Sequence, residues 1–252
     1  MFDSHIHLNS DIFFNDLDAV VEKMTLAGVT GAAIGGYNES SSRRAVMVNE
    51  RYPKMLATAG FHPLFLEGDE LSDEFALFLE TAEIAAIGEI GLDFWGGRDD
   101  EARQKKFFEA QAIIAKERAL PIVLHIRKSF YETLSLLDST GFKGPALHHA
   151  FSGSADMAEK ALERGHYLSV GGKITYPERD KLRELFSTVP KERLLVETDA
   201  PDIPIFKRRG EPHRPTDLLD IIAALSEVIG LTPEETAKLT EENAKSFFGC
   251  KG

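Results

Sequence analysis

The stretch DSHIHLN (residues 3–9) lies at the start of the chain and places two histidines on either side of one isoleucine. In a β-strand, side chains two residues apart point to the same face, so His5 and His7 would share a face with Asp3. A single His-x-His is a weak motif. It is compatible with half of a metal site and also with a buried strand that holds two imidazoles. The residues at the other strand ends distinguish these two possibilities.

The same local pattern, a short apolar run followed by a longer stretch of helical periodicity, occurs eight times. The runs are residues 2–7, 31–35, 55–61, 84–89, 121–126, 145–150, 166–171 and 194–199. They are rich in Ile, Val, Leu and Ala, as expected for strands covered by helices. The helical period is clear after the last run, in the apolar stripe Leu218, Ile221, Ile222, Leu225 and Ile229.

Eight such units in 252 residues predict an α/β protein with a TIM-like (β/α)8 barrel, formed as a single domain over residues 1–252. A doubly wound open sheet is the competing architecture. It would usually need fewer strands, and no Gly-rich dinucleotide turn follows the first run.

The formal net charge of −12 argues against a broad basic surface that coats DNA. It does not exclude a nucleic acid gripped locally by bound metal ions. Cys250 is the only cysteine, so no intramolecular disulfide can form. No apolar run approaches the ~20 residues of a membrane span, and the N-terminus does not resemble a signal peptide. We therefore expect a soluble, cytoplasmic protein without a membrane partner.

Reactive side chains gather where these runs end, which is where barrel enzymes carry their chemistry. They are His5, His7, His62, Glu89, Asp93, His125, Arg127, His148, His149, Glu197 and Asp199. Taken alone, His125 could be a core histidine, Glu89 an ion-pair partner and Asp199 a loop cap. Together, and with compatible parity except at His148, they predict one cluster for which a divalent metal pair is the simplest partner.

The remaining histidines receive other assignments. His148 has the opposite parity to His149, so we expect it to pack outward against a helix. His166 and His213 are expected at the surface or in loops.

The motifs that carry these residues resemble one family along nearly the whole chain. They are DSHIHL, GFHP (60–63), IGEIGLDF (87–94), LPIVLHIR (120–127), HAFSG (149–153), LLVETDAP (194–201) and NAKSFFG (243–249). The chain is similar to the TatD-type deoxyribonucleases, metal-dependent hydrolases of the amidohydrolase-like superfamily. It departs from the usual pattern at GGYNESS after the second run and at Gly210, in loops expected to touch substrate.

The resemblance implies a role for each position. His5, His7 and Asp199 would hold one divalent ion, His125 and His149 a second, and Glu89 would bridge the two. Asp199 and Glu89 are thus the catalytic candidates, with Asp199 as the general base as well as a ligand.

Two more positions, His62 and Arg127, resemble those that line the substrate site. Glu197 is expected to orient a ligand imidazole from behind. Imidazole ligands favour Zn or Mn over Mg, whereas nucleases of this family are often described with Mg or Mn, so the metal stays open.

The predicted activity is a metal-dependent phosphodiesterase, a 3′-exonuclease type of deoxyribonuclease that acts on DNA ends. Phe61, Phe94, Trp95 and Tyr176 are candidates for stacking on a base. The alternative is a carboxyl-ester or amide hydrolase, such as an aminoacyl-tRNA deacylase, because fold alone does not choose the substrate. A barrel that keeps metal only for structure is a third possibility. No obligate protein partner is evident in the sequence.

Overall fold

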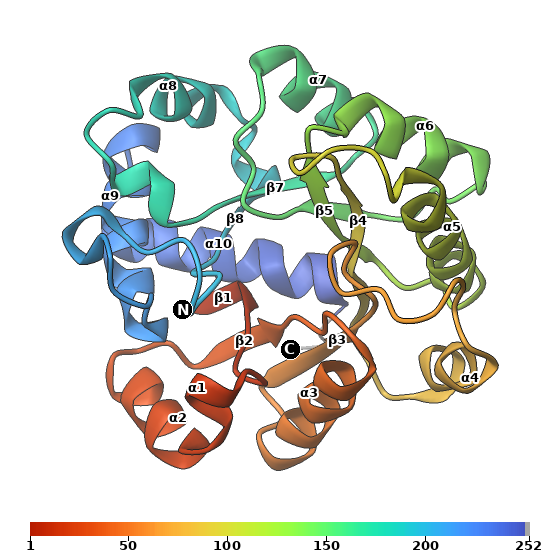
Figure 1. Cartoon of the computed structure of the whole chain (residues 1–252). Helices are drawn as coiled ribbons and strands as arrows, with labels where there is room; N and C mark the ends of the chain where they lie inside the picture. Colours follow the sequence, from red (N-terminus) through yellow and green to blue (C-terminus); the bar gives the residue numbers. More distant parts are fainter. Residues whose placement is uncertain (250–252) are drawn as a thin grey trace. The chain divides into compact units, whose positions relative to one another are not determined.

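The computed structural model describes residues 1–249, and its contacts divide the chain into two compact units. The first unit comprises residues 1–34 together with the segment from 149 onward, and the second comprises residues 35–148. Figure 1 shows how strands and helices alternate along the chain. Cys250, the only cysteine, lies outside the described residues.

The strands of the first unit are β1 (Phe2–Ile6), β2 (Gly31–Ile34), β7 (Tyr167–Val170) and β8 (Leu194–Val196). β1 pairs with β2, and β7 with β8, in parallel. Its helices are α1 (Asp11–Phe14), α2 (Leu17–Leu26), α7 (Ala155–Glu163), α8 (Asp180–Thr188), α9 (Leu218–Ile229) and α10 (Pro233–Phe248). Short 3₁₀ turns η1 (Gly172–Thr175), η2 (Lys191–Arg193), η3 (Phe206–Arg208) and η4 (Pro215–Asp217) connect them.

Helix α10 covers β1 and β8, and its ends follow from its sequence. Thr232 and Glu235 form a reciprocal capping box around Pro233, and Gly249 ends the helix in the left-handed conformation. Its buried face packs Phe248 against Phe2, with ring centroids 5.8 Å apart. Strand β1, which carries His5 and directly precedes His7, is therefore held by the last helix of the chain.

The second unit contains β3 (Met55–Ala59), β4 (Ala86–Asp93), β5 (Ile122–Arg127) and β6 (Ala146–His148), which pair in parallel in this order. Its helices are α3 (Glu39–Arg51), α4 (Asp73–Thr81), α5 (Glu101–Glu117) and α6 (Phe130–Ser139). Phe61, Phe75 and Phe107 form part of its core, and the Phe61 ring lies 4.8 Å from Phe75 and 5.5 Å from Phe107.

Two glycines let β4 approach β5 more closely than other residues could. A Cβ atom on Gly91 would lie 1.8 Å from the carbonyl oxygen of His125, and one on Gly88 would lie 2.7 Å from Cβ of Val123. Both distances are far below van der Waals contact. The glycines of IGEIGLD thus set the position of His125 relative to Glu89 and Asp93.

The predicted strands all form, with shifts of a few residues at their ends. β4 continues to Asp93, past the predicted end at residue 89, and β8 already ends at Val196. The predicted stripe on α9 is buried from Leu218 to Leu225. Within residues 1–249, no helix is long and apolar enough to cross a membrane. The single domain over 1–252 stays a prediction.

Candidate metal centre

The end of β1 and the segment after β8 are held together by backbone hydrogen bonds. The amide of Asp199 donates to the carbonyl of His5 at 2.9 Å, and the amide of His7 donates to the carbonyl of Ala200 at 2.9 Å. Asp199 adopts a left-handed backbone conformation with φ of 58°. Aspartate tolerates this conformation better than most residues, and backbone outliers of this kind gather at functional sites.

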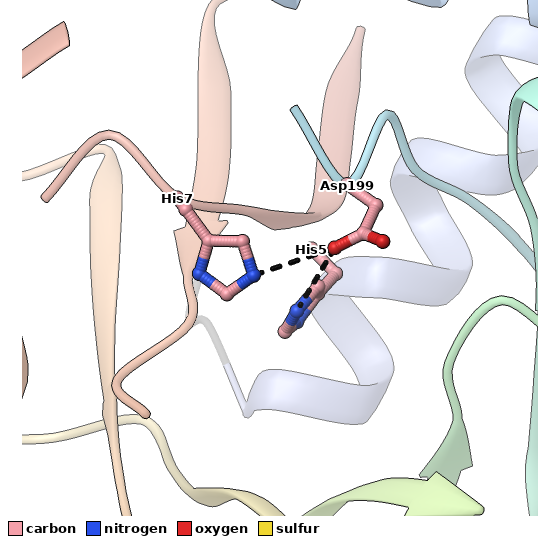
Figure 2. A group of neighbouring side chains, drawn as sticks. All are labelled: His5, His7 and Asp199. Carbon is pink, nitrogen blue, oxygen red and sulfur yellow. Dashed lines mark ion pairs between the residues drawn. The ribbon is translucent and has the colours of Figure 1, made fainter. Parts of the chain in front are cut away.

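This backbone arrangement brings three donor side chains together (Figure 2). Oδ1 of Asp199 lies 3.3 Å from Nε2 of His7 and 3.6 Å from Nε2 of His5. All three residues are buried. Burial alone would raise the pKa of Asp199, but the hydrogen bond from His7 and the nearby histidines lower it below its ordinary value. The carboxylate is therefore ionised at neutral pH. We call these three residues the first donor cluster.

The ring of His149 lies next to the first donor cluster. Its ring centroid lies 4.5 Å from that of His5. Behind it, Oε1 of Glu197 lies 3.4 Å from Nδ1 of His149 and accepts a 2.7 Å hydrogen bond from the amide of Ala150. The hydroxyl of Ser169 donates to the other carboxylate oxygen. Glu197 is fully buried and held by these donors. It thus occupies a position from which a carboxylate can orient an imidazole.

Asp3 lies beneath this cluster and fixes Thr198, the residue before Asp199. It accepts hydrogen bonds from the amide of Thr198 at 2.9 Å and from its hydroxyl at 2.6 Å. Burial raises the pKa of Asp3 to about 8, although these hydrogen bonds lower it in part. Sequence parity places Asp3 on the face of His5 and His7, and its bonds to Thr198 give it a supporting role.

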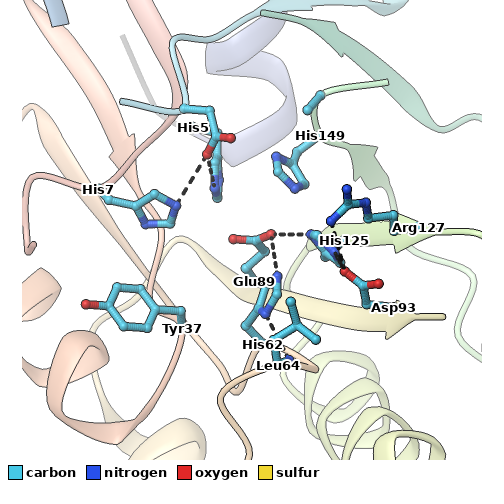
Figure 3. A network of polar contacts seen from close by, with 12 residues as sticks. His5, His7, Tyr37, His62, Leu64, Glu89, Asp93, His125, Arg127 and His149 are labelled. Carbon is cyan, nitrogen blue, oxygen red and sulfur yellow. Dashed lines mark hydrogen bonds and ion pairs between the residues drawn. The ribbon is translucent and has the colours of Figure 1, made fainter. Parts of the chain in front are cut away.

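A second donor cluster consists of His62 from the loop after β3, Glu89 from β4 and His125 from β5 (Figure 3). Oε1 of Glu89 lies 2.9 Å from Nδ1 of His125 and 3.4 Å from Nε2 of His62. The rings of His62 and His125 are 4.1 Å apart. The sequence assigned His62 to the substrate. In the structure its imidazole also lies beside the carboxylate of Glu89.

Asp93 faces His125 from the opposite side. Its Oδ2 lies 3.0 Å from Nε2 of His125, so both ring nitrogens of His125 face a carboxylate. Burial would raise the pKa of Asp93, but the hydrogen bonds from His125 and the Trp95 amide, with the charge of Arg127, lower it. The sequence places Asp93 at a strand end but predicts no role for it. Its parity with Glu89 was the available signal.

Arg127 ends β5 and is half-exposed, with Nη1 4.0 Å from Oδ2 of Asp93. The other histidines lie apart from the clusters. His148 packs its ring 5.7 Å from Phe130 of α6, as its parity predicts. His166 and His213 lie in loops, as one of the two expected positions, but both are buried and neither is at the surface. His213 sits in a loop that folds inward: its amide donates to Pro201, and Nδ1 lies 3.2 Å from the carbonyl of Asp202.

The donor atoms of each cluster lie within 4.8 Å of one another, which suits a shared cation. Two imidazoles and one carboxylate form a donor set that late first-row divalent ions prefer. Uncompensated, so many polar groups would be costly to bury. The residues present therefore fit a divalent metal.

Comparison with known proteins gives a consistent result. The family model "TatD related DNase" matches residues 2–249. The uncharacterized metal-dependent hydrolase YabD of Bacillus subtilis is 31% identical over 98% of both chains. The 3′-5′ ssDNA/RNA exonuclease TatD of Citrobacter koseri is 33% identical over 99% of both chains.

Among solved structures, the TatD homologue YjjV from Escherichia coli K12 matches with a TM-score of 0.92 and 31% identity. The match covers 100% of this chain and 98% of that one. It confirms the predicted fold class, the TIM-like (β/α)8 barrel. The chain belongs to the TatD family of metal-dependent hydrolases.

Proposed function

We propose that this chain is a phosphodiesterase that hydrolyses single-stranded DNA from its 3′ end with two bound divalent ions. The observation that carries the proposal is the first donor cluster, in which an ionised Asp199 faces the Nε2 atoms of His5 and His7. Support for the substrate comes from relatives named 3′-5′ ssDNA/RNA exonuclease, such as that of Citrobacter koseri.

The proposed ligands come from both clusters and from His149. His5, His7 and Asp199 would hold one ion, His125 and His149 would hold the other, and Glu89 would be shared. Zn, Mn and Mg are the candidate metals. When bound, the ions would supply the positive charge that activates water and offsets the negative charge developing on the phosphate.

Asp199 is the proposed general base. Its pKa is lowered, so at neutral pH the carboxylate is free of a proton and can accept one from the attacking water. The backbone bonds of residues 199 and 200 to β1 hold the carboxylate in one orientation, which favours a proton acceptor at a fixed position.

His62 is better suited to bind substrate than to bind metal. Its Nδ1 accepts a 3.1 Å hydrogen bond from the amide of Leu64, so a neutral ring carries its proton on Nε2. That nitrogen is then a donor, and it can donate to a phosphate oxygen. Arg127 would hold the phosphate with parallel N–H groups.

Two carboxylates would orient the ligand imidazoles, Asp93 for His125 and Glu197 for His149. Each lies at one ring nitrogen of its histidine. A carboxylate in this position fixes the ring and strengthens its donor nitrogen.

The test is a substrate panel on metal-free protein reloaded with Mg²⁺, Mn²⁺ or Zn²⁺. The panel contains 3′-labelled single-stranded DNA, the matching RNA, an aminoacyl-tRNA and a simple carboxyl ester. We expect shortening of the DNA from its 3′ end, and none with Glu89→Ala. Turnover of an ester with DNA untouched by every metal would replace the proposal with the alternative, a carboxyl-ester hydrolase. A cytoplasmic location and the lack of an obligate protein partner stay predictions.

A further inference from the structure

Trp95 is exposed beside the second donor cluster, in the loop that follows β4. The residue keeps 62% of its surface open to solvent, an unusual state for so large an aromatic residue. It is also the only tryptophan in the chain. An exposed aromatic ring next to reactive residues points to a ligand, because the fold gains little from it.

Two cations lie over the indole. The guanidinium carbon of Arg127 is 4.4 Å from the ring centroid, and Nζ of Lys128 is 5.5 Å from it. These contacts hold the indole by cation–π attraction. A ring that remains 62% exposed under such contacts still presents a large part of its surface to solvent.

Asp93 contacts both the loop that carries Trp95 and the proposed ligand His125. Its Oδ1 accepts a 2.9 Å hydrogen bond from the amide of Trp95, and its Oδ2 lies 3.0 Å from Nε2 of His125. The amide of Phe94 adds a 2.8 Å bond to the carbonyl of Arg127. One buried carboxylate thus fixes the backbone at Trp95 and a proposed ligand histidine relative to each other.

A cavity of about 370 Å³ lies beside the loop that carries Trp95. Its lining includes Pro63, Leu64, Asp93, Gly96, Gly97 and Arg103. This volume falls within the usual range of ~300–1,000 Å³ for small-ligand pockets. Asp99 and Asp100 also line it and would repel a phosphate, whereas Arg127 and Lys128 at the indole would attract one.

We infer that Trp95, Arg127 and Lys128 form a nucleotide subsite, in which the indole stacks on a base of single-stranded DNA and the cations bind the adjoining phosphate. This inference rests on the proposed function, because it assigns the substrate contacts of the same site. Because any base can stack on the indole, the subsite would bind without preference for sequence. It would select single strands over duplex, in which the bases already stack on each other.

The binding test uses the lone tryptophan as its own reporter. The holoenzyme is titrated with a single-stranded oligonucleotide whose phosphorothioate linkages resist cleavage, and with a matched oligonucleotide carrying abasic residues at its 3′ end. We expect the base-bearing strand to quench indole emission and the abasic strand to leave it nearly unchanged. Equal quenching by both strands overturns the inference.

The kinetic test uses Trp95→Ala and Trp95→Phe. For Trp95→Ala we expect KM for single-stranded DNA to rise about tenfold, with kcat within twofold. Trp95→Phe should recover most of the loss, and the abasic strand should not distinguish Trp95→Ala from wild type. The control is Tyr131→Ala, which removes another exposed aromatic ring, on α6 of the same unit. An unchanged KM in Trp95→Ala overturns the inference.

The two proposals fail in different ways. If DNA is hydrolysed but the base-bearing and abasic strands quench indole emission equally, the subsite is wrong and the nuclease function stands. If no nucleic acid is hydrolysed, the function is wrong, and the titration still decides the stacking because it needs no turnover. Because Trp95 is mostly exposed, its substitution should leave the thermal unfolding temperature unchanged.

Discussion

The two donor clusters hold similar side chains by different means. In the first, backbone hydrogen bonds between the segment 5–7 and residues 199–200 set the geometry. The buried Asp3 supports it through Thr198, and the buried Glu197 supports the neighbouring His149. In the second, close strand packing at Gly91 and contacts among side chains set the geometry. Beside this cluster, the half-exposed Arg127 contacts the exposed Trp95. The first cluster is thus suited to a fixed reactive group, and the second to contact with a substrate.

The largest effect is expected in the first cluster. Asp199→Asn removes a proposed ligand and the proposed general base while keeping the side-chain shape. We expect kcat/KM on single-stranded DNA to fall about 10³-fold. Asp180→Asn, an exposed acid on α8, is the control and should keep wild-type activity. Activity of Asp199→Asn within tenfold of wild type would remove its role as base.

In the second cluster, Gly91→Ala should act through packing. The new Cβ would lie 1.8 Å from the carbonyl of His125, so the strands must separate. We expect a loss of about 2–3 kcal/mol in the free energy of unfolding, measured by denaturant titration. Gly96→Ala, where nothing lies within 4 Å of the added atom, is the matched control. Equal stability of the two variants would show that β4 and β5 are not held this tightly.

Glu197→Gln tests the support of the first cluster's neighbour, His149. The amide keeps the size of the carboxylate but brings N–H groups toward the Ala150 amide and the Ser169 hydroxyl. We expect metal affinity to fall about 10–100-fold, measured by calorimetric titration of metal-free protein. Glu192→Gln, an exposed residue in η2, should bind as wild type does. A wild-type affinity in Glu197→Gln would limit Glu197 to a structural role.

The last prediction concerns the pH dependence of stability and Asp3. Its pKa of about 8 in the folded state lies above its ordinary value of 3.8, so the folded protein keeps a proton that the unfolded chain releases. The resulting stability is complete below about pH 4 and is lost as pH rises to about 8, by up to about 1.4 kcal/mol per unit. In metal-free protein, Asp3→Asn should therefore show a flatter pH dependence of unfolding than wild type. Parallel curves would contradict the raised pKa.

Strand periodicity and the chemistry at the strand ends were sufficient to predict the fold and most of the candidate site. His5, Glu89 and His125 lie in β1, β4 and β5, the strands that their runs predict, and His7 directly follows β1. These features depend on local sequence alone, which is why a single chain reveals them.

The loops after the strands were not predictable in the same way. β8 ends at Val196, so strand parity does not orient Glu197 or Asp199. Their orientation comes from bonds to residues distant in the sequence, such as His5 and Ala150. His213 is buried for a similar reason, because its loop is tied to Pro201 and Asp202. Burial lowers the pKa of this histidine, which therefore stays neutral.

The count of bound metal ions per chain tests the central claim most directly. Metal-free wild type, Asp199→Asn and His125→Ala are reloaded with Mn²⁺ or Zn²⁺, dialysed and measured by elemental analysis. We predict two equivalents in wild type and about one in each variant, because each variant loses a ligand of a different ion. One equivalent or fewer in wild type, or an unchanged count in His125→Ala, would contradict a two-ion centre built from both clusters.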